Sequence, residues 1–148
     1  MEKQSIKERI EQKTAEIEKF LAFLSEELPE NLEEYKKDEK RKAACERFAE
    51  KVIQALVDLS FLLFRYHQKA FEKDDSEIFS SLQKEKIIEE SLAIRLRSAR
   101  GMRNFLAHEY EDINDEIIFE ALQDGLERDA TEFIKIVKKS LSEAKVAK

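Results

Sequence analysis

One segment of the chain, ARGMRNFLAHEYEDI (residues 99–113), gathers the residue types that chemistry on a phosphate ester requires. Arg103 and His108 stand five positions apart, Asn104 follows the arginine, and Tyr110 comes two positions after the histidine. Arginine is a permanent cation whose N–H fork matches phosphate oxygens, and histidine has an ordinary pKa of about 6.5, suited to proton transfer near neutrality. The pattern Arg-x-x-x-x-His-x-Tyr therefore indicates a site that acts on a phosphodiester.

An arginine and a histidine are together sufficient to cleave RNA without a metal ion. In such a reaction a base helps the ribose 2′-hydroxyl to attack its own phosphorus, and an acid assists departure of the 5′-oxygen. A cation neutralises the charge that builds up on the phosphorane-like transition state. DNA lacks the 2′-hydroxyl, so this chemistry predicts a ribonuclease that leaves DNA intact.

One regular helix does not bring these side chains together. At about 100° per residue, Asn104 and His108 lie about 40° apart, whereas Arg103 lies about 140° from His108. Three arrangements could unite them: the helix ends near His108, the long arginine side chain curls round, or a two-fold related copy completes the site. We favour a cleft between two subunits.

The composition predicts an all-α protein, because Gly occurs twice and Pro once, which leaves few residues for the tight turns of hairpins. We expect one domain over residues 1–148, folded as an up-and-down bundle of four to five helices. The expected elements are a helix from Ile6 closed by Pro29, a long helix capped at Asn31, a loop over Glu72–Ser76 with Asp75 or Ser76 as the next cap, a short helix over Glu77–Leu82, a helix from about Glu85 to Leu106, and a last helix from Asn114 or Asp115 to Leu141.

The stretch from Val52 to Phe64 is apolar around most of a helix circumference. A helix tolerates this only when it is covered on more than one side, so the stretch is either the central helix of the bundle or a subunit interface. Since a lone small bundle would struggle to cover so much apolar surface, we predict a homodimer.

Charge and cysteine usage exclude several classes of protein. The chain has 27 Lys and Arg against 33 Asp and Glu, a net charge of −6, so any RNA contact is expected to be local. A single cysteine, Cys45, forms no internal disulfide, and two histidines fall short of a structural zinc set, so we expect neither metal nor cofactor. The longest wholly apolar stretch is too short to span a bilayer and the N-terminus does not read as a signal peptide, which predicts a cytoplasmic protein without membrane contact.

The segment RNFLAHEY resembles the Arg-x-x-x-x-His-x-Tyr motif of HepT-like toxins, which belong to the HEPN ribonuclease superfamily. The order of the expected elements is similar as well, and the resemblance covers nearly all of the chain. It implies an all-helical dimer that places two motifs at its interface as a metal-independent endoribonuclease site. By the same resemblance Arg103 and His108 would be the catalytic pair, and Asn104 would position His108 or the phosphate.

The resemblance also implies a partner. HepT-like toxins pair with an MNT-type nucleotidyltransferase antitoxin in type VII-like toxin–antitoxin systems, where transfer of AMP to the motif tyrosine silences the nuclease; Tyr110 is the matching position. The resemblance does not decide whether the toxin and antitoxin form larger assemblies. The alternative hypothesis is a non-catalytic helical interaction module that binds nucleotide or a nucleotidyltransferase partner.

Three further arginines precede the motif. Arg95, Arg97 and Arg100 form either an exposed helix face balanced by Glu89 and Glu90 or a strip that guides RNA, and we keep them out of the catalytic set.

Overall fold

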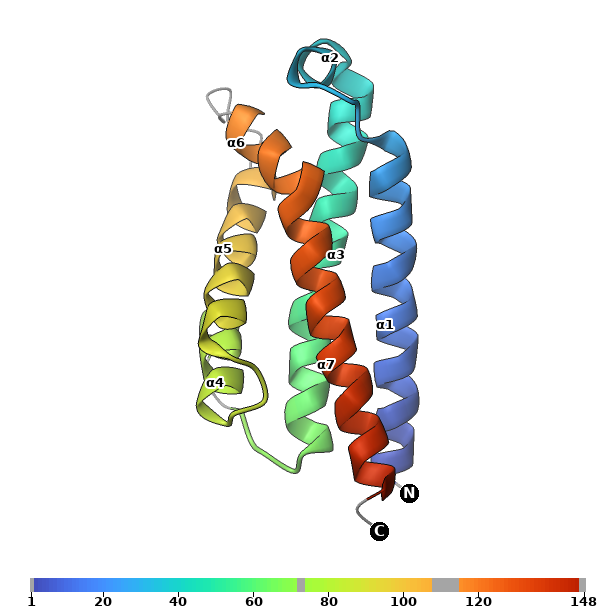
Figure 1. The fold of residues 1–148 in the computed structure, drawn as a ribbon, viewed down its shortest axis with the longest axis vertical. Helices are drawn as coiled ribbons and strands as arrows, with labels where there is room; N and C mark the ends of the chain where they lie inside the picture. Colours follow the sequence, from blue (N-terminus) through green and yellow to red (C-terminus); the bar gives the residue numbers. More distant parts are fainter. Residues whose placement is uncertain (1, 72–73, 108–114, 147–148) are drawn as a thin grey trace.

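The computed structural model describes residues 2–71, 74–107 and 115–146, and within these ranges the chain forms helices joined by turns (Figure 1). The elements are α1 (Glu2–Glu27), α2 (Leu32–Lys37), α3 (Glu39–Tyr66), a 3₁₀ turn η1 (Asp75–Glu77), α4 (Ile78–Lys84), α5 (Glu90–Ala107), α6 (Asp115–Glu120), a π-helical turn η2 (Ala121–Gly125) and α7 (Leu126–Val146). Two residues of the predicted site, His108 and Tyr110, lie outside the described ranges.

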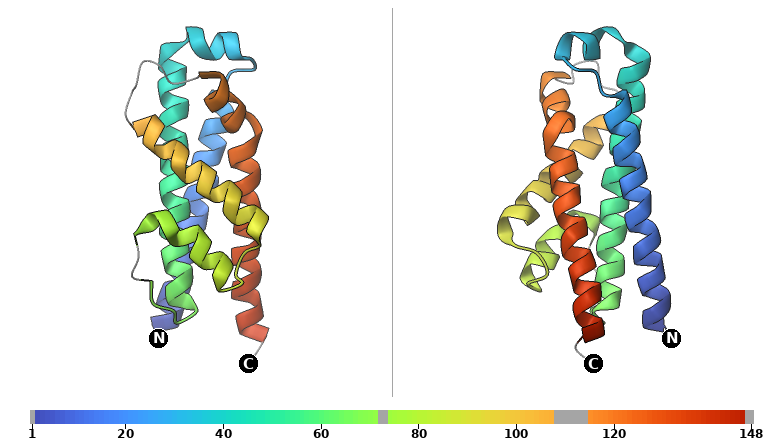
Figure 2. Two further views of the ribbon diagram at one scale, coloured as in Figure 1. Left: turned by 90° about the vertical axis from the view of Figure 1, so that its left-hand side faces the viewer. Right: turned by 45° about the vertical axis from the view of Figure 1, so that its right-hand side comes forward.

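Three long helices, α1, α3 and α7, run side by side along the molecule, and α5 crosses the bundle obliquely with the short α4 next to it (Figures 1 and 2). The chain passes up α1 and down α3, and α2 lies across the end where these two helices meet. The prediction of an all-α up-and-down bundle is confirmed. None of the described helices is long and apolar enough to cross a membrane.

The apolar run of α3 is the centre of this bundle. Between Val52 and Phe64 every residue except Gln54, Asp58 and Phe61 is buried. The run is covered within one chain, because α3 packs against α1, α4, α5 and α7. Of the two alternatives, the central helix is therefore correct, and this run leaves no surplus apolar surface for a subunit interface.

The first two helix boundaries follow the sequence signals, and one additional boundary appears. Pro29 follows α1, and the Asn31 side chain accepts a hydrogen bond from the Glu34 amide at 2.9 Å as the N-cap of α2. Asp38 then ends α2 and caps α3, accepting from the Arg41 amide at 3.1 Å. Where one long helix was expected there are two, because Asp38 leaves the helical conformation.

The expected start of α5 at Glu85 is wrong by five residues, because the chain turns between α4 and α5. Lys86 adopts a left-handed backbone conformation with a φ of 62°. Its amide donates to the Gln83 carbonyl, and the Ile87 amide donates to the Leu82 carbonyl, both at 2.9 Å. These two bonds form the motif that commonly ends a helix at a glycine, here built with a lysine.

The loop before α4 also differs from expectation in its cap. Neither Asp75 nor Ser76 is the capping residue; instead Asp74 caps the 3₁₀ turn by accepting from the Ser76 amide at 2.9 Å. This leaves the Asp75 side chain available for contacts elsewhere. The last predicted helix corresponds to α6, η2 and α7, which follow one another directly from Asp115.

Candidate functional site

Arg103 points from α5 toward α3 and the 3₁₀ turn. Its Nη1 donates to Oε1 of Gln54 at 2.5 Å, and its Nη2 donates to Oδ2 of Asp75 at 3.3 Å. The arginine side chain is 20% exposed, so it is not sealed from solvent. The candidate catalytic cation is therefore held at two points by residues 49 and 28 positions away in the sequence.

Asp75 joins two arginines of α5. Its Oδ1 accepts from Nε of Arg100 at 3.1 Å and from Nη2 of the same guanidinium, while Oδ2 is the oxygen that faces Arg103. The hydrogen bonds from Arg100, followed by that from Arg103, hold the pKa of the Asp75 carboxyl below its usual value. Asp75 is therefore a carboxylate at neutral pH, and it neutralises part of the charge that two arginines bring to this edge of α5.

The contacts continue from Gln54 across α3 to α1. Nε2 of Gln54 donates to Oδ1 of Asp58 at 3.0 Å, and the other carboxylate oxygen of Asp58 pairs with Nζ of Lys13 at 3.6 Å. Lys13 also pairs with Glu16 at 2.9 Å. A continuous line of polar contacts thus fixes the orientation of the Arg103 guanidinium relative to the two longest helices of the bundle.

The structure places the other predicted site residues as follows. Asn104 is exposed on α5 and, one position after Arg103, points about 100° away from it. His108 and Tyr110 lie outside the described residues. The predicted approach of His108 to Arg103, within one chain or across two, stays a prediction.

Sequence reasoning missed Gln54 and Asp75. Neither residue has a sequence spacing that links it to Arg103, since the contacts arise from the packing of α5 against α3 and the turn before α4. The only available signal was the pair of consecutive aspartates in the loop, of which Asp74 serves as the cap and leaves Asp75 without a local role.

The arginines upstream of the motif also have other partners than expected. Arg95 pairs with Asp129 and with Glu132 of α7, and Arg100 pairs with Asp75. The expected balance by Glu89 and Glu90 is therefore replaced by these partners, and the RNA-guiding interpretation stays a prediction. Arg97 is exposed, as both interpretations expected.

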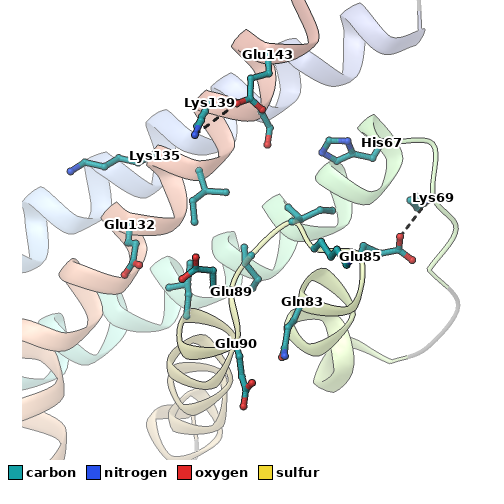
Figure 3. A pocket seen from close by; sticks show the side chains of 16 residues that line it. His67, Lys69, Gln83, Glu85, Glu89, Glu90, Glu132, Lys135, Lys139 and Glu143 are labelled. Carbon is teal, nitrogen blue, oxygen red and sulfur yellow. Dashed lines mark ion pairs between the residues drawn. The ribbon is translucent and has the colours of Figure 1, made fainter. Parts of the chain in front are cut away.

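An open pocket of about 1030 Å³ lies elsewhere, between the end of α3, the α4–α5 turn and α7 (Figure 3). Both acidic and basic side chains line it, among them Glu132, Lys135 and Lys139 of α7. Because the lining favours neither sign of charge and contains none of the predicted site residues, the candidate site stays at Arg103.

No cluster of three or more His, Cys, Asp or Glu side chains that could hold a metal ion occurs in the described part of the chain. Cys45 is fully buried, and burial raises its pKa to about 11, so it is a thiol of the core rather than a ligand or nucleophile.

Comparison with known proteins decides the family. A family model described as "Ribonuclease HepT-like" matches residues 10–139, which is most of the chain and includes Arg103, Asn104 and His108. The chain belongs to the HepT-like ribonuclease family. The resemblance seen in the motif is thereby confirmed for the fold as a whole.

Two curated HepT relatives are similar to this chain in sequence. The mRNA nuclease HepT of Shewanella oneidensis is 27% identical over 85 residues, which cover 57% of this chain and 63% of the relative. The tRNA nuclease HepT of Aphanizomenon flos-aquae is 26% identical over 98 residues, 66% of this chain and 67% of the relative. The chain thus matches somewhat under two thirds of the Shewanella protein.

A solved toxin structure shows the same fold. A tri-AMPylated HEPN toxin of Shewanella oneidensis, crystallised in complex with an MNT antitoxin, superposes with a TM-score of 0.79 at 22% identity. The superposition covers 88% of this chain and 96% of the toxin. The likeness therefore extends over most of the bundle.

Proposed function

We propose that this protein is the toxin of a HepT/MNT toxin–antitoxin pair and cleaves RNA as a metal-independent endoribonuclease. Membership of the HepT-like ribonuclease family is the observation that carries the proposal. The motif residues of that family are present as Arg103, Asn104, His108 and Tyr110. Of the two curated relatives, one is named an mRNA nuclease and the other a tRNA nuclease, so membership of the family does not by itself identify the target RNA.

In the proposed reaction Arg103 binds the scissile phosphate and His108 moves protons. The 2′-oxygen forms a bond to phosphorus as its proton passes to a neutral imidazole, and the bond from phosphorus to the 5′-oxygen breaks as that oxygen takes up a proton from an imidazolium. The products are a 2′,3′-cyclic phosphate and a 5′-hydroxyl end. Arg103 stabilises the charge on the equatorial oxygens, and Asn104 positions His108 or the phosphate.

A second copy of the chain supplies the second histidine in this proposal. The apolar surface for pairing lies on α5 rather than on α3, since Ile94 is 48% exposed and Phe105 is 56% exposed. Eleven positions separate them, so they lie about 20° apart on one helix face. Gly101 lies on the same face, and a Cβ there would meet nothing within 4 Å, so another helix can approach closely. Arg103 points to the other side of α5, so the second copy's histidine would have to reach it around the helix rather than directly across the paired faces.

The proposed partner is an MNT-type nucleotidyltransferase antitoxin that transfers AMP to Tyr110. A solved toxin of similar fold carries AMP and forms a complex with such an antitoxin, which supports the same partnership here. An adenylate near Arg103 would compete with RNA phosphate for the same cation and so would block binding. Intact mass after co-expression should rise in steps of about 329 Da per AMP, and Tyr110→Phe should abolish the increments.

Cleavage in the presence of EDTA tests the nuclease itself. Wild-type protein should cut a mixed RNA substrate to cyclic-phosphate ends, and His108→Ala, verified as folded by circular dichroism, should lose at least about a hundredfold in rate. Arg103→Lys should lose a similar amount, because an ammonium cannot reproduce the fork that contacts Gln54, Asp75 and phosphate together. Intact RNA with all three proteins would favour the non-catalytic interaction module instead.

A further inference from the structure

We propose that Asp75 is a positioning residue of the cleavage site, which fixes the Arg103 guanidinium for the transition state and uses Arg100 as its own anchor. The inference rests on the proposed ribonuclease function and adds to it a residue outside the HepT-like motif. Its basis is a set of contacts between α5 and the 3₁₀ turn that the motif spacing does not predict.

The two oxygens of Asp75 have different partners. Oδ1 takes both hydrogen bonds from Arg100, and Oδ2 is the oxygen directed at Arg103. The side chains of Asp75, Arg100 and Arg103 are 30%, 19% and 20% exposed, so water screens the ion pairs only in part. Arg100 thus orients a carboxylate that in turn orients the candidate catalytic cation.

A planar guanidinium needs two points of attachment to fix its rotation. For Arg103 these are Asp75 on one terminal nitrogen and Gln54 on the other, which spends two of the five N–H donors that an arginine carries. Held in this way, the guanidinium does not have to reorganise when charge develops on the phosphate, which is the condition for strong electrostatic catalysis.

The charge of Asp75 has an opposite effect on RNA binding. A carboxylate beside the phosphate site repels the phosphate and lowers the affinity for RNA in the ground state. The same residue therefore has two separable effects: it weakens RNA binding and increases the rate of cleavage of bound RNA. A residue that only stabilised the fold would not separate these two quantities.

The local fold of the turn does not need the Asp75 side chain. The cap of the 3₁₀ turn is Asp74, whose Oδ1 accepts from the Ser76 amide at 2.9 Å. Asp74 is one position from Asp75 and has the same charge, and its described hydrogen bonds are with Ser76 rather than with Arg103. Asp74→Asn is therefore a matched control, because asparagine caps a helical turn about as well as aspartate does.

The experiment compares Asp75→Asn, Asp75→Glu and Asp74→Asn with the wild type. Cleavage of a short RNA gives kcat and KM, and an oligonucleotide with 2′-deoxyribose at the scissile position gives Kd without cleavage. Asp75→Asn should lower kcat at least about tenfold while KM and Kd stay the same or fall. Asp75→Glu should recover part of kcat, Asp74→Asn should match the wild type, and the pH profile of Asp75→Asn should keep its shape, since Asp75 transfers no proton.

Three outcomes would overturn the inference. The first is a wild-type kcat for Asp75→Asn in a protein that cleaves RNA, which would leave the proposed function intact. The second is a parallel loss of kcat and RNA affinity, with no recovery in Asp75→Glu, which would make Asp75 a purely structural residue. The third is a wild type that does not cleave RNA at all, which refutes the proposed function and the inference with it.

Discussion

Asp129 of α7 is 6% exposed and forms an ion pair with Arg95 of α5. Nε of Arg128 approaches the same carboxylate oxygen at 3.3 Å, and Arg95 also pairs with the more exposed Glu132 at 2.9 Å. The helix that carries the candidate catalytic residues is thus tied to the last helix of the bundle through a buried carboxylate. This contact lies eight positions, or about 12 Å along α5, before the contacts of Arg103.

The two carboxylates that meet Arg95 should differ in their contribution to stability. Asp129→Ala should lower the free energy of unfolding by about 2–4 kcal/mol, because it removes the buried partner of a cation that is itself 29% exposed. Glu132→Ala removes a partner with a 45% exposed side chain and should cost less than about 1 kcal/mol. Urea unfolding measures both, and equal losses would show that burial does not set the strength of these pairs.

The left-handed residues after α3 and α4 should be sites where glycine stabilises the fold. Gln68 and Lys86 have φ values of 59° and 62°, which favour glycine. Lys86→Gly should therefore raise the free energy of unfolding by about 0.5–1 kcal/mol, and Gln68→Gly should act similarly. As a control, Gln83→Gly inside α4 should destabilise by about 1 kcal/mol. A loss of stability in Lys86→Gly would contradict the strain argument.

Pairing through α5 predicts which exposed apolar residue matters for association. Phe105→Ser should shift the protein from dimer to monomer in sedimentation experiments without lowering the stability of the monomer, because the side chain is 56% exposed in the single chain. Ile117→Ser changes a residue that is 62% exposed on α6 and should leave the dimer intact. A dimer that survives Phe105→Ser, or a wild-type monomer, would place any interface elsewhere.

The Asp75 ion pairs predict a dependence of stability on acidic pH. The pKa of this carboxyl is lower in the folded protein than its usual 3.8, so the unfolded chain binds its proton first as the pH falls. The stabilisation is complete above about pH 5 and disappears as the pH falls through the folded pKa. The difference in unfolding free energy between wild type and Asp75→Asn should shrink between about pH 6 and pH 2 in urea titrations. A constant difference over this range would mean that the ion pairs do not contribute.

Cys45 should report on global unfolding. It is 0% exposed with a pKa raised from 9.0 to about 11, which lowers its thiolate fraction at pH 8 about a hundredfold. An alkylating reagent should therefore label it far more slowly in the native protein than in urea, with a rate that follows the unfolding equilibrium. Fast labelling under native conditions would show that the part of the bundle around the start of α3 opens without unfolding of the whole protein.

The sequence signals that predicted the fold correctly are local ones. Pro29 and Asn31 act through their own backbone and side chain, so the end of α1 and the start of α2 were predictable from residue type. The apolar run of α3 likewise required coverage on several sides and received it. Fold class and helix order follow from such signals, because periodicity and capping depend on neighbours in the chain.

Two features were not predictable from the sequence, namely the turn between α4 and α5 and the partners of Arg103. Lys86 ends α4 in a conformation normally marked by glycine, so the start of α5 was not visible in the sequence. The contacts of Arg103 with Gln54 and Asp75 depend on how three separate elements pack, and no spacing encodes them. The motif thus names the residues that we propose to carry the chemistry, and the packing of α5 determines which residues hold Arg103.

Helix α1 runs opposite to α3 and α7, which brings the first described residues of α1 and the last of α7 to one end of the bundle, whereas α2 and α6 lie at the other (Figure 1). Arg103 contacts α3 at Gln54, which lies twelve positions, or about 18 Å along the helix axis, before the last residue of α3. An affinity tag, fluorophore or surface linker attached at either terminus would therefore leave the α3–α5 edge open. Immobilised protein can then be offered RNA and antitoxin in turn on the same sensor.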